Sequence, residues 1–272
     1  MRQDLAIDFL LFSVIGASSD DSCGELIKAS IERAYQDASS HVGYEPKQGR
    51  ETDEGKIIKA IENLEAENQA SFDMWHDETC RAILPKEGNG GYGKAQKWLN
   101  MTLKYLAVTY AVIKSIGKDT QEYLVFYEKT LQPCESYFHI PIDSYICDAL
   151  AWSGVADDSD NLLPLAEGEQ WPKRKKVSGC ATPYDSYVKS WSTWSPNEYK
   201  SLSNSLKSYA GCNLDWETQA WITVARCRRD LDAMREAAKQ EGKRAGRKAL
   251  KPIREDYKNR LNSFANGDSA SD

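Results

Sequence analysis

The spacing of apolar residues is the feature that most constrains the fold of this chain. Apolar side chains recur three and four positions apart over residues 3–17, 23–40 and 54–79. On a helix this spacing gathers them on one face, and it differs from the alternation typical of strands. Residues 94–116 are expected to form a further helix, and alternating patterns are almost absent. The sequence therefore predicts an all-α fold.

Capping residues locate two later helices. Asp143 or Ser144 is placed to cap a helix, because a short polar side chain there precedes an apolar run. Ser195 opens an S-x-x-E capping box, and Pro196 fits the first helical turn. We therefore expect one helix to begin near residue 144 and another to cover residues 196–210.

Three other segments have weaker patterns. Residues 121–132 are expected to be helical, although their YLVFY core could instead form a short strand. Residues 214–260 are expected to hold one or two helices. Residues 153–185 combine DDSD, LPLAEGEQWP and KRKK, which is the composition of a loop.

These segments suggest one unit built in four parts. The expected parts are N-terminal helices (1–83), a hairpin and catalytic core (84–152), a loop-rich insertion (153–195) and C-terminal helices (196–260).

The numbers and positions of cysteine, histidine and apolar residues limit the classes of protein to which this chain can belong. Apolar residues make up 41% of the 272 residues, which is enough for a core. The seven cysteines are scattered without a C-x-x-C pair and the three histidines lie far apart, so we expect reduced thiols, no metal and no cofactor. The apolar run 9–17 has Asp4 and Asp8 where a signal peptide carries positive charge. A cytoplasmic protein without a membrane partner is expected.

Charge is distributed unevenly along the chain. The net charge is −6, but residues 226–260 carry 13 Lys and Arg against 6 Asp and Glu, a net of +7. Such a basic segment could follow a phosphate backbone, or its charges could simply be solvated.

A glycine-rich loop precedes the helix at residues 94–116. The stretch GNGGYGKAQK places Gly91 and Gly93 just before it. Closely spaced glycines can expose successive backbone N–H groups, and a helix N-terminus adds further donors, so this arrangement is typical of anion sites. Ala95 follows Lys94 where a Walker loop needs Ser or Thr, which disfavours a nucleoside triphosphate.

Three lysines share one face of that helix, namely Lys94, Lys97 and Lys104. On an exposed face they would only increase solubility. If they were partly buried beside a carboxylate, one of them could lose its proton and attack an electron-poor carbon.

The segments GYGKAQK and HIPIDSYICDAL together resemble the core of the helix-hairpin-helix DNA glycosylases. The resemblance implies that Asp143 is the catalytic aspartate and that Lys97 or Lys94 is the nucleophilic amine. It also implies that Gly91 and Gly93 bind a DNA phosphate. We expect Tyr92 in the hairpin and Lys104 on the helix to contact DNA as well.

The chain departs from the family pattern in several places. KEGNG separates Pro85 from Gly91, and strict register would place the family's lysine at Ala95. The AQK sequence is more similar to the archaeal 8-oxoguanine branch, which favours Lys97 over Lys94. Lys97 and Asp143 are 46 residues apart, so residues 117–138 would be an inserted element. The cluster-binding cysteines of the endonuclease branch are absent.

The resemblance implies excision of a modified base from double-stranded DNA. An ionised Asp143 would stabilise positive charge on the sugar, and the lysine could form an imine that permits strand cleavage. The flipped base needs a pocket, for which we expect Trp98, His139 and Trp152. Stacking faces are also expected in or beside loop-like sequence, at Trp152, Trp171, Trp191 and Trp194.

The acidic composition bears on the substrate. A sequence pI near 5.3 implies weak nonspecific adhesion to DNA, which is similar to what is expected of a bacterial anti-phage DNA glycosylase that attacks glucosylated hydroxymethylcytosine. We expect a monomer acting in antiviral defence. Two alternatives stay open: a noncatalytic helix-hairpin-helix DNA-binding module, and a helical protein-interaction scaffold whose lysine face is plain surface.

Overall fold

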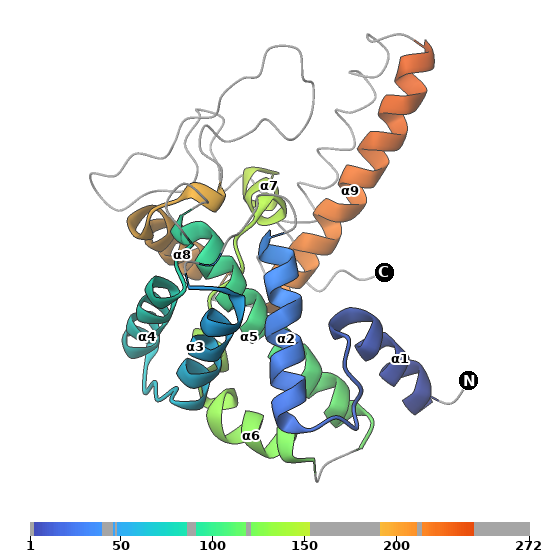
Figure 1. Ribbon diagram of the computed structural model, residues 1–272. Helices are drawn as coiled ribbons and strands as arrows, with labels where there is room; N and C mark the ends of the chain where they lie inside the picture. The colour runs from blue at the N-terminus through green and yellow to red at the C-terminus, as the bar shows by residue number, and fades with distance from the viewer. Residues whose placement is uncertain are drawn as a thin grey trace. The chain divides into compact units, whose positions relative to one another are not determined.

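The computed structural model describes residues 3–39, 46, 48–85, 91–117, 121–152, 191–210 and 214–241. Over these ranges the chain is helical and contains no strand longer than an isolated bridge between Pro46 and Pro85, which confirms the all-α prediction (Figure 1). The α-helices are α1 (Gln3–Ile15), α2 (Cys23–Ser39), α3 (Arg50–Glu62), α4 (Gln69–Ala82), α5 (Tyr92–Ser115), α6 (Glu122–Thr130), α7 (Ser144–Trp152), α8 (Pro196–Ala210) and α9 (Leu214–Glu241). Two short 3-10 helices are η1 (Gln132–Tyr137) and η2 (Trp191–Thr193).

The chain forms two compact units. The first unit comprises Met1–Pro141 and Ser192–Pro196, and therefore holds α1 to α6 and η1. The second unit comprises Ile142–Trp191 and Asn197–Asp272, and holds α7, α8 and α9. The expectation of one glycosylase-like unit over the whole chain stays a prediction.

Helix α5 is the central helix of the first unit. All nine of its first residues, Tyr92–Asn100, are buried, as expected of a helix with neighbours on every side. Helix α2 packs against it (Figure 1). There the Trp98 indole N–H donates to the Ile31 carbonyl oxygen at 3.0 Å, and the Trp98 and Tyr35 rings meet in an edge-to-face arrangement.

The predicted single helix over residues 54–79 is wrong, because the structure has two helices there. Helix α3 ends at Glu62 and α4 begins at Gln69. Asn68 caps α4: its side chain accepts from the Ser71 N–H, and the Ser71 hydroxyl accepts from the Asn68 N–H. Since apolar spacing resumes beyond the break, periodicity alone does not reveal the interruption.

Other helix boundaries follow the sequence closely. Helix α5 covers the expected residues 94–116 to within two positions, and α8 begins at Pro196 and ends at residue 210 as predicted. The strand alternative for YLVFY is wrong, since these residues lie in α6. The loop-like residues 153–190 and the end of the basic segment, from residue 242 on, lie outside the described residues.

None of the helices in the described ranges combines the length and the apolar character needed to cross a membrane.

Candidate functional site

The two candidate nucleophilic lysines are buried in the first unit. Lys94 is 2% exposed and Lys97 is 8% exposed, whereas Lys104, further along α5, is half-buried. The idea that this lysine face is plain surface is therefore wrong for Lys94 and Lys97. Burial lowers the pKa of the Lys94 amine, because removal of water disfavours its charged form. The direction of this shift is the one that favours the uncharged amine.

The glycines at the start of α5, Gly91 and Gly93, are bonded to another part of the first unit. Gly91 is the N-cap of α5, and its N–H donates to the Ser192 carbonyl oxygen at 2.8 Å. The Gly93 N–H donates to the Trp194 carbonyl oxygen at 3.3 Å. Because these two amides already have acceptors, this structure does not present them to a phosphate as the sequence predicted.

Tyr92, the residue between these glycines, is also turned inward. It is buried, and its side chain hydrogen-bonds the Cys80 thiol. Tyr92 is therefore a packing residue of the α4–α5 contact in this structure, rather than the exposed DNA contact expected from the sequence.

A chain of hydrogen bonds between buried side chains links α4 to α5. We call it the amide relay, and it consists of His76, Asn100 and Gln96. His76 Nε2 lies 2.7 Å from Asn100 Oδ1, and Asn100 Nδ2 donates to Gln96 Oε1 at 2.9 Å. Gln96 Nε2 in turn donates to the Gly93 carbonyl oxygen at 2.8 Å. The relay therefore joins α4 to the first turn of the lysine-bearing helix.

The end of the relay fixes the direction of every bond in it. The carbonyl oxygen of Gly93 can only accept, so Gln96 presents its amide N–H to Gly93 and its oxygen to Asn100. Asn100 then donates from Nδ2 and accepts at Oδ1, which requires the proton of His76 to be on Nε2. Asn100 Nδ2 also lies 3.4 Å from the Ile140 carbonyl oxygen. The amide of Asn100 thereby holds segment 138–141 against α5.

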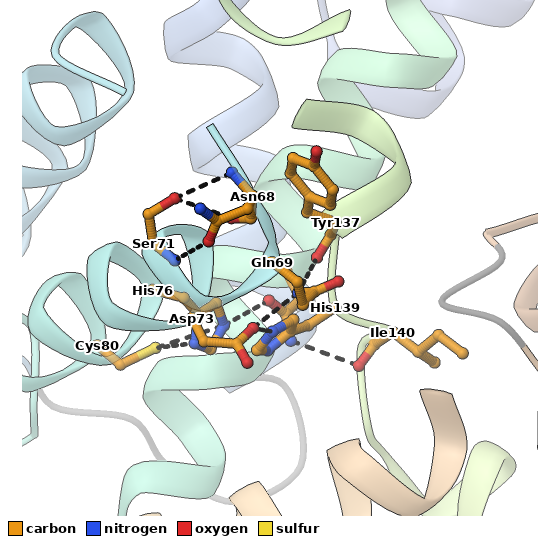
Figure 2. A network of polar contacts seen from close by, with 10 residues as sticks. Asn68, Gln69, Ser71, Asp73, His76, Cys80, Tyr137, His139 and Ile140 are labelled. Carbon is orange, nitrogen blue, oxygen red and sulfur yellow. Dashed lines mark hydrogen bonds and ion pairs between the residues drawn. The ribbon is translucent and has the colours of Figure 1, made fainter. Parts of the chain in front are cut away.

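His139, predicted as a pocket residue, lies beside His76, the first member of this relay (Figure 2). Its Nε2 is 2.8 Å from Asp73 Oδ1, and its ring lies 4.2 Å from that of His76, centroid to centroid. Gln69 Nε2 donates both to Asp73 Oδ1 and to the Tyr137 carbonyl oxygen, as Figure 2 shows. In this arrangement His139 orders the contact between α4 and the segment after η1.

Cys80 completes the cluster around His76. Its sulfur lies 3.8 Å from His76 Nδ1, as drawn in Figure 2. Burial raises the pKa of the Cys80 thiol, so the thiol keeps its proton. A protonated thiol is a weak donor toward Nδ1, and it is not a nucleophile.

Asp143 belongs to the second unit and caps α7, as the sequence predicted. Its Oδ1 accepts the Tyr145 N–H at 2.8 Å and the Ile146 N–H at 3.1 Å. The side chain is 9% exposed. Because both of these cap bonds fall on one oxygen, the structure holds the carboxylate in a fixed orientation at the start of α7.

The second unit also contains an aromatic stack, which includes Tyr145, the residue whose backbone N–H donates to Asp143. The Tyr145 ring stacks on the Trp221 ring of α9, with centroids 4.9 Å apart and an interplanar angle of 23°. Trp221 is 40% exposed. The Trp221 ring is thus partly exposed and packs on Tyr145, which follows the capping residue by two positions.

The other candidate tryptophans have different surroundings. Trp98 and Trp194 are buried, so neither offers the pocket wall or stacking face that the sequence predicted for it. Trp191 is half-buried. The side chain of Trp152 and all of Trp171 lie outside the described residues.

Four residues of these clusters were not predicted as site residues from the sequence, namely His76, Gln96, Asn100 and Trp221. A signal was present for the first three, because Gln96 and Asn100 are four residues apart on one helix face and His76 and Cys80 repeat that spacing. Within the described residues no group of three or more His, Cys, Asp or Glu side chains is placed to hold a metal ion.

Comparison with protein-family models, with curated proteins and with solved structures found no match to this chain. The function therefore has to be inferred from the residues of the chain itself.

Proposed function

We propose that this protein is a DNA glycosylase that excises a modified base from double-stranded DNA. The burial of Lys94, with the lowered pKa of its amine, is the observation that carries the proposal. A charged ammonium is costly to bury, and a lysine in such a place is suited to act as a neutral nucleophile. The resemblance of GYGKAQK and HIPIDSYICDAL to the helix-hairpin-helix glycosylases gives this amine a sugar as its target.

In the proposed reaction Lys94 Nζ attacks C1′ of the nucleotide. The bond from C1′ to the base breaks, and the base leaves with the bonding electrons and takes up a proton. Opening of the sugar ring then gives an imine between Nζ and C1′. Lys97, one turn further along α5, is the alternative amine.

The resemblance to the glycosylases assigns Asp143 the electrostatic role in this proposal. Positive charge builds up on the sugar as the bond to the base breaks, and an ionised carboxylate in a dry site stabilises that charge. The cap bonds to Tyr145 and Ile146 hold the side chain in place before substrate binds, so little reorganisation is needed during the reaction.

Trp221 supports the assignment of a base as substrate. A base extruded from the duplex has to exchange its stacking on neighbours for stacking on the enzyme. Trp221, supported by Tyr145, offers a partly exposed ring to a flat heteroaromatic group. Because the amides of Gly91 and Gly93 are occupied, we assign the proposed phosphate contact to Lys104 rather than to those amides.

Mass spectrometry of the bases released from genomic DNA tests the proposal. The panel includes heavily modified phage DNA, such as DNA carrying glucosylated hydroxymethylcytosine, because the acidic chain suits a selective substrate. The wild-type protein should release one kind of base, and Asp143→Asn should release none.

Asparagine is as good an N-cap as aspartate, so this variant removes the charge and keeps the cap. Asp215→Asn, at an exposed position in the first turn of α9, serves as the matched control and should excise normally. Full excision by Asp143→Asn would refute the proposed role of the carboxylate. If no DNA in the panel released a base, two alternatives would remain: a noncatalytic DNA-binding module and a helical protein-interaction scaffold.

A further inference from the structure

Helix α1 exposes an unusually large apolar surface. Five of its side chains are between 42% and 66% exposed, namely Leu5, Phe9, Leu10, Phe12 and Val14. Only the opposite face, with Leu11 and Ile15, is buried. Single exposed apolar residues are common, but five on a helix of 13 residues form a contiguous patch of the kind that marks an interaction site.

The exposed apolar side chains of α1 lie in two rows. Leu5, Phe9 and Phe12 follow the i, i+4, i+7 spacing and form one ridge, while Leu10 and Val14 form a second. The small residues Ala6 and Ser13 lie between the ridges, because helical geometry places them about 60–100° from each. The surface therefore offers both a ridge and a groove to a partner.

The groove between these ridges has no unsatisfied polar group that would attract a charged partner. The Ser13 hydroxyl donates to the Phe9 carbonyl oxygen at 2.7 Å, within the helix itself. Asp8 is turned toward the following turn, where its Oδ1 accepts the Ser19 N–H at 2.7 Å. The arc formed by the exposed side chains at positions 5–14 is thus uncharged, and it fits another uncharged apolar surface.

We infer that this face of α1 binds the same face of a second copy of the chain. A two-fold contact needs a self-complementary surface, and the ridges of one α1 fit the small-residue groove of the other. Large apolar side chains expose about 100 Å² each when half-exposed, so the pair would bury about 1,000 Å² in total. This area lies at the lower end for specific interfaces, and it fits a reversible dimer rather than a permanent one.

The charges on and around α1 do not favour binding of this face to a lipid surface. Interfacial helices carry Lys or Arg beside their apolar face, but α1 has no basic residue over Gln3–Ile15. Residues 1–72 carry 7 Lys and Arg against 14 Asp and Glu, a net of −7, which anionic lipid would repel. The same charge predicts that added salt strengthens the dimer, because salt screens the repulsion between copies. Binding to DNA would weaken with salt.

Sedimentation equilibrium of the full chain tests the inference. Wild type should dimerise at tens of micromolar, more strongly at higher salt, and Phe9→Glu should weaken the dimer at least about 30-fold, because it places a charge in an apolar contact. Phe9 is exposed, so circular dichroism should show the fold of the variant unchanged. Val125→Glu is the matched control, since Val125 is exposed on α6 and should not affect association.

Three outcomes would overturn the inference. The first is that the wild-type protein is still a monomer at about 100 µM, which is well above the range in which such an interface should form. The second is a dimer that Phe9→Glu leaves intact. The third is a monomer that binds phosphatidylcholine–phosphatidylglycerol vesicles through Phe9. The last would assign the face to lipid.

Discussion

Helix α1 leaves five large apolar side chains in contact with solvent, whereas the first nine residues of α5 bury two lysines and the Asn100 and Gln96 amides. Each arrangement carries a cost. Burying a polar group removes its favourable contacts with water. Leaving an apolar group exposed forgoes the favourable free energy of removing it from water. The two helices belong to the same unit, so the contrast does not reflect a general looseness of packing. We assign the exposed face of α1 to a partner, and the buried polar groups of α5 to chemistry or to the α4–α5 contact.

The largest expected difference is in the free energy of unfolding, between an apolar truncation on α5 and one on α1. Leu103 of α5 is fully buried, and Leu103→Ala should lower the free energy of unfolding by about 2–5 kcal/mol, because it leaves a cavity. Phe12→Ala on α1 removes a larger side chain but should change that free energy by less than about 0.5 kcal/mol. Urea denaturation at low protein concentration, where a weak dimer is dissociated, measures both. Equal losses would show that α1 is packed like α5.

The next effect concerns the amide relay. Asn100→Leu should destabilise the protein by about 2–3 kcal/mol, because it leaves the His76 N–H and the Gln96 oxygen buried without this partner. Asn63→Ala is the matched control, since Asn63 makes an exposed bond to the Lys59 carbonyl oxygen. It should cost less than about 1 kcal/mol. If Asn100→Leu left the free energy of unfolding unchanged, the relay would contribute nothing to the stability of the α4–α5 contact.

The smallest effect is a change in the pH dependence of stability. Burial makes the pKa of Lys94 lower in the folded protein than in the unfolded chain. Between these two pKa values, the Lys94 amine binds more protons in the unfolded chain than in the folded protein, so stability rises with pH. Lys94 therefore opposes folding at neutral pH, and this opposition fades as the pH rises. Lys94→Met should flatten the rise in stability between pH 7 and about 10, measured by urea denaturation. Lys59→Met, at an exposed position, should leave the slope as in wild type.

Local sequence signals predicted much of the fold. Asp143 caps α7 and α8 begins at Pro196, because these residues act on the backbone within one turn of themselves. The break between α3 and α4 was missed because apolar spacing is the same on both sides, although the Asn68 cap was a local sign of it.

The candidate site was less predictable, because its features depend on contacts between distant residues. The amides of Gly91 and Gly93 are bonded to Ser192 and Trp194, about 100 positions away in the sequence. A glycine pattern cannot show that its donors are already used. Likewise, the lysine spacing gave the shared face of Lys94 and Lys97 but not its burial, which depends on what packs over it.

Borohydride trapping on abasic DNA, followed by peptide mass spectrometry, tests the proposed use of the buried amine most directly. Reduction makes an imine permanent, so the modified peptide identifies the nucleophile. We predict an adduct on Lys94 that is lost in Lys94→Met and kept in Lys59→Met. An adduct on Lys97 would move the nucleophile one turn along α5, whereas an adduct outside α5, or none at all, would contradict the account.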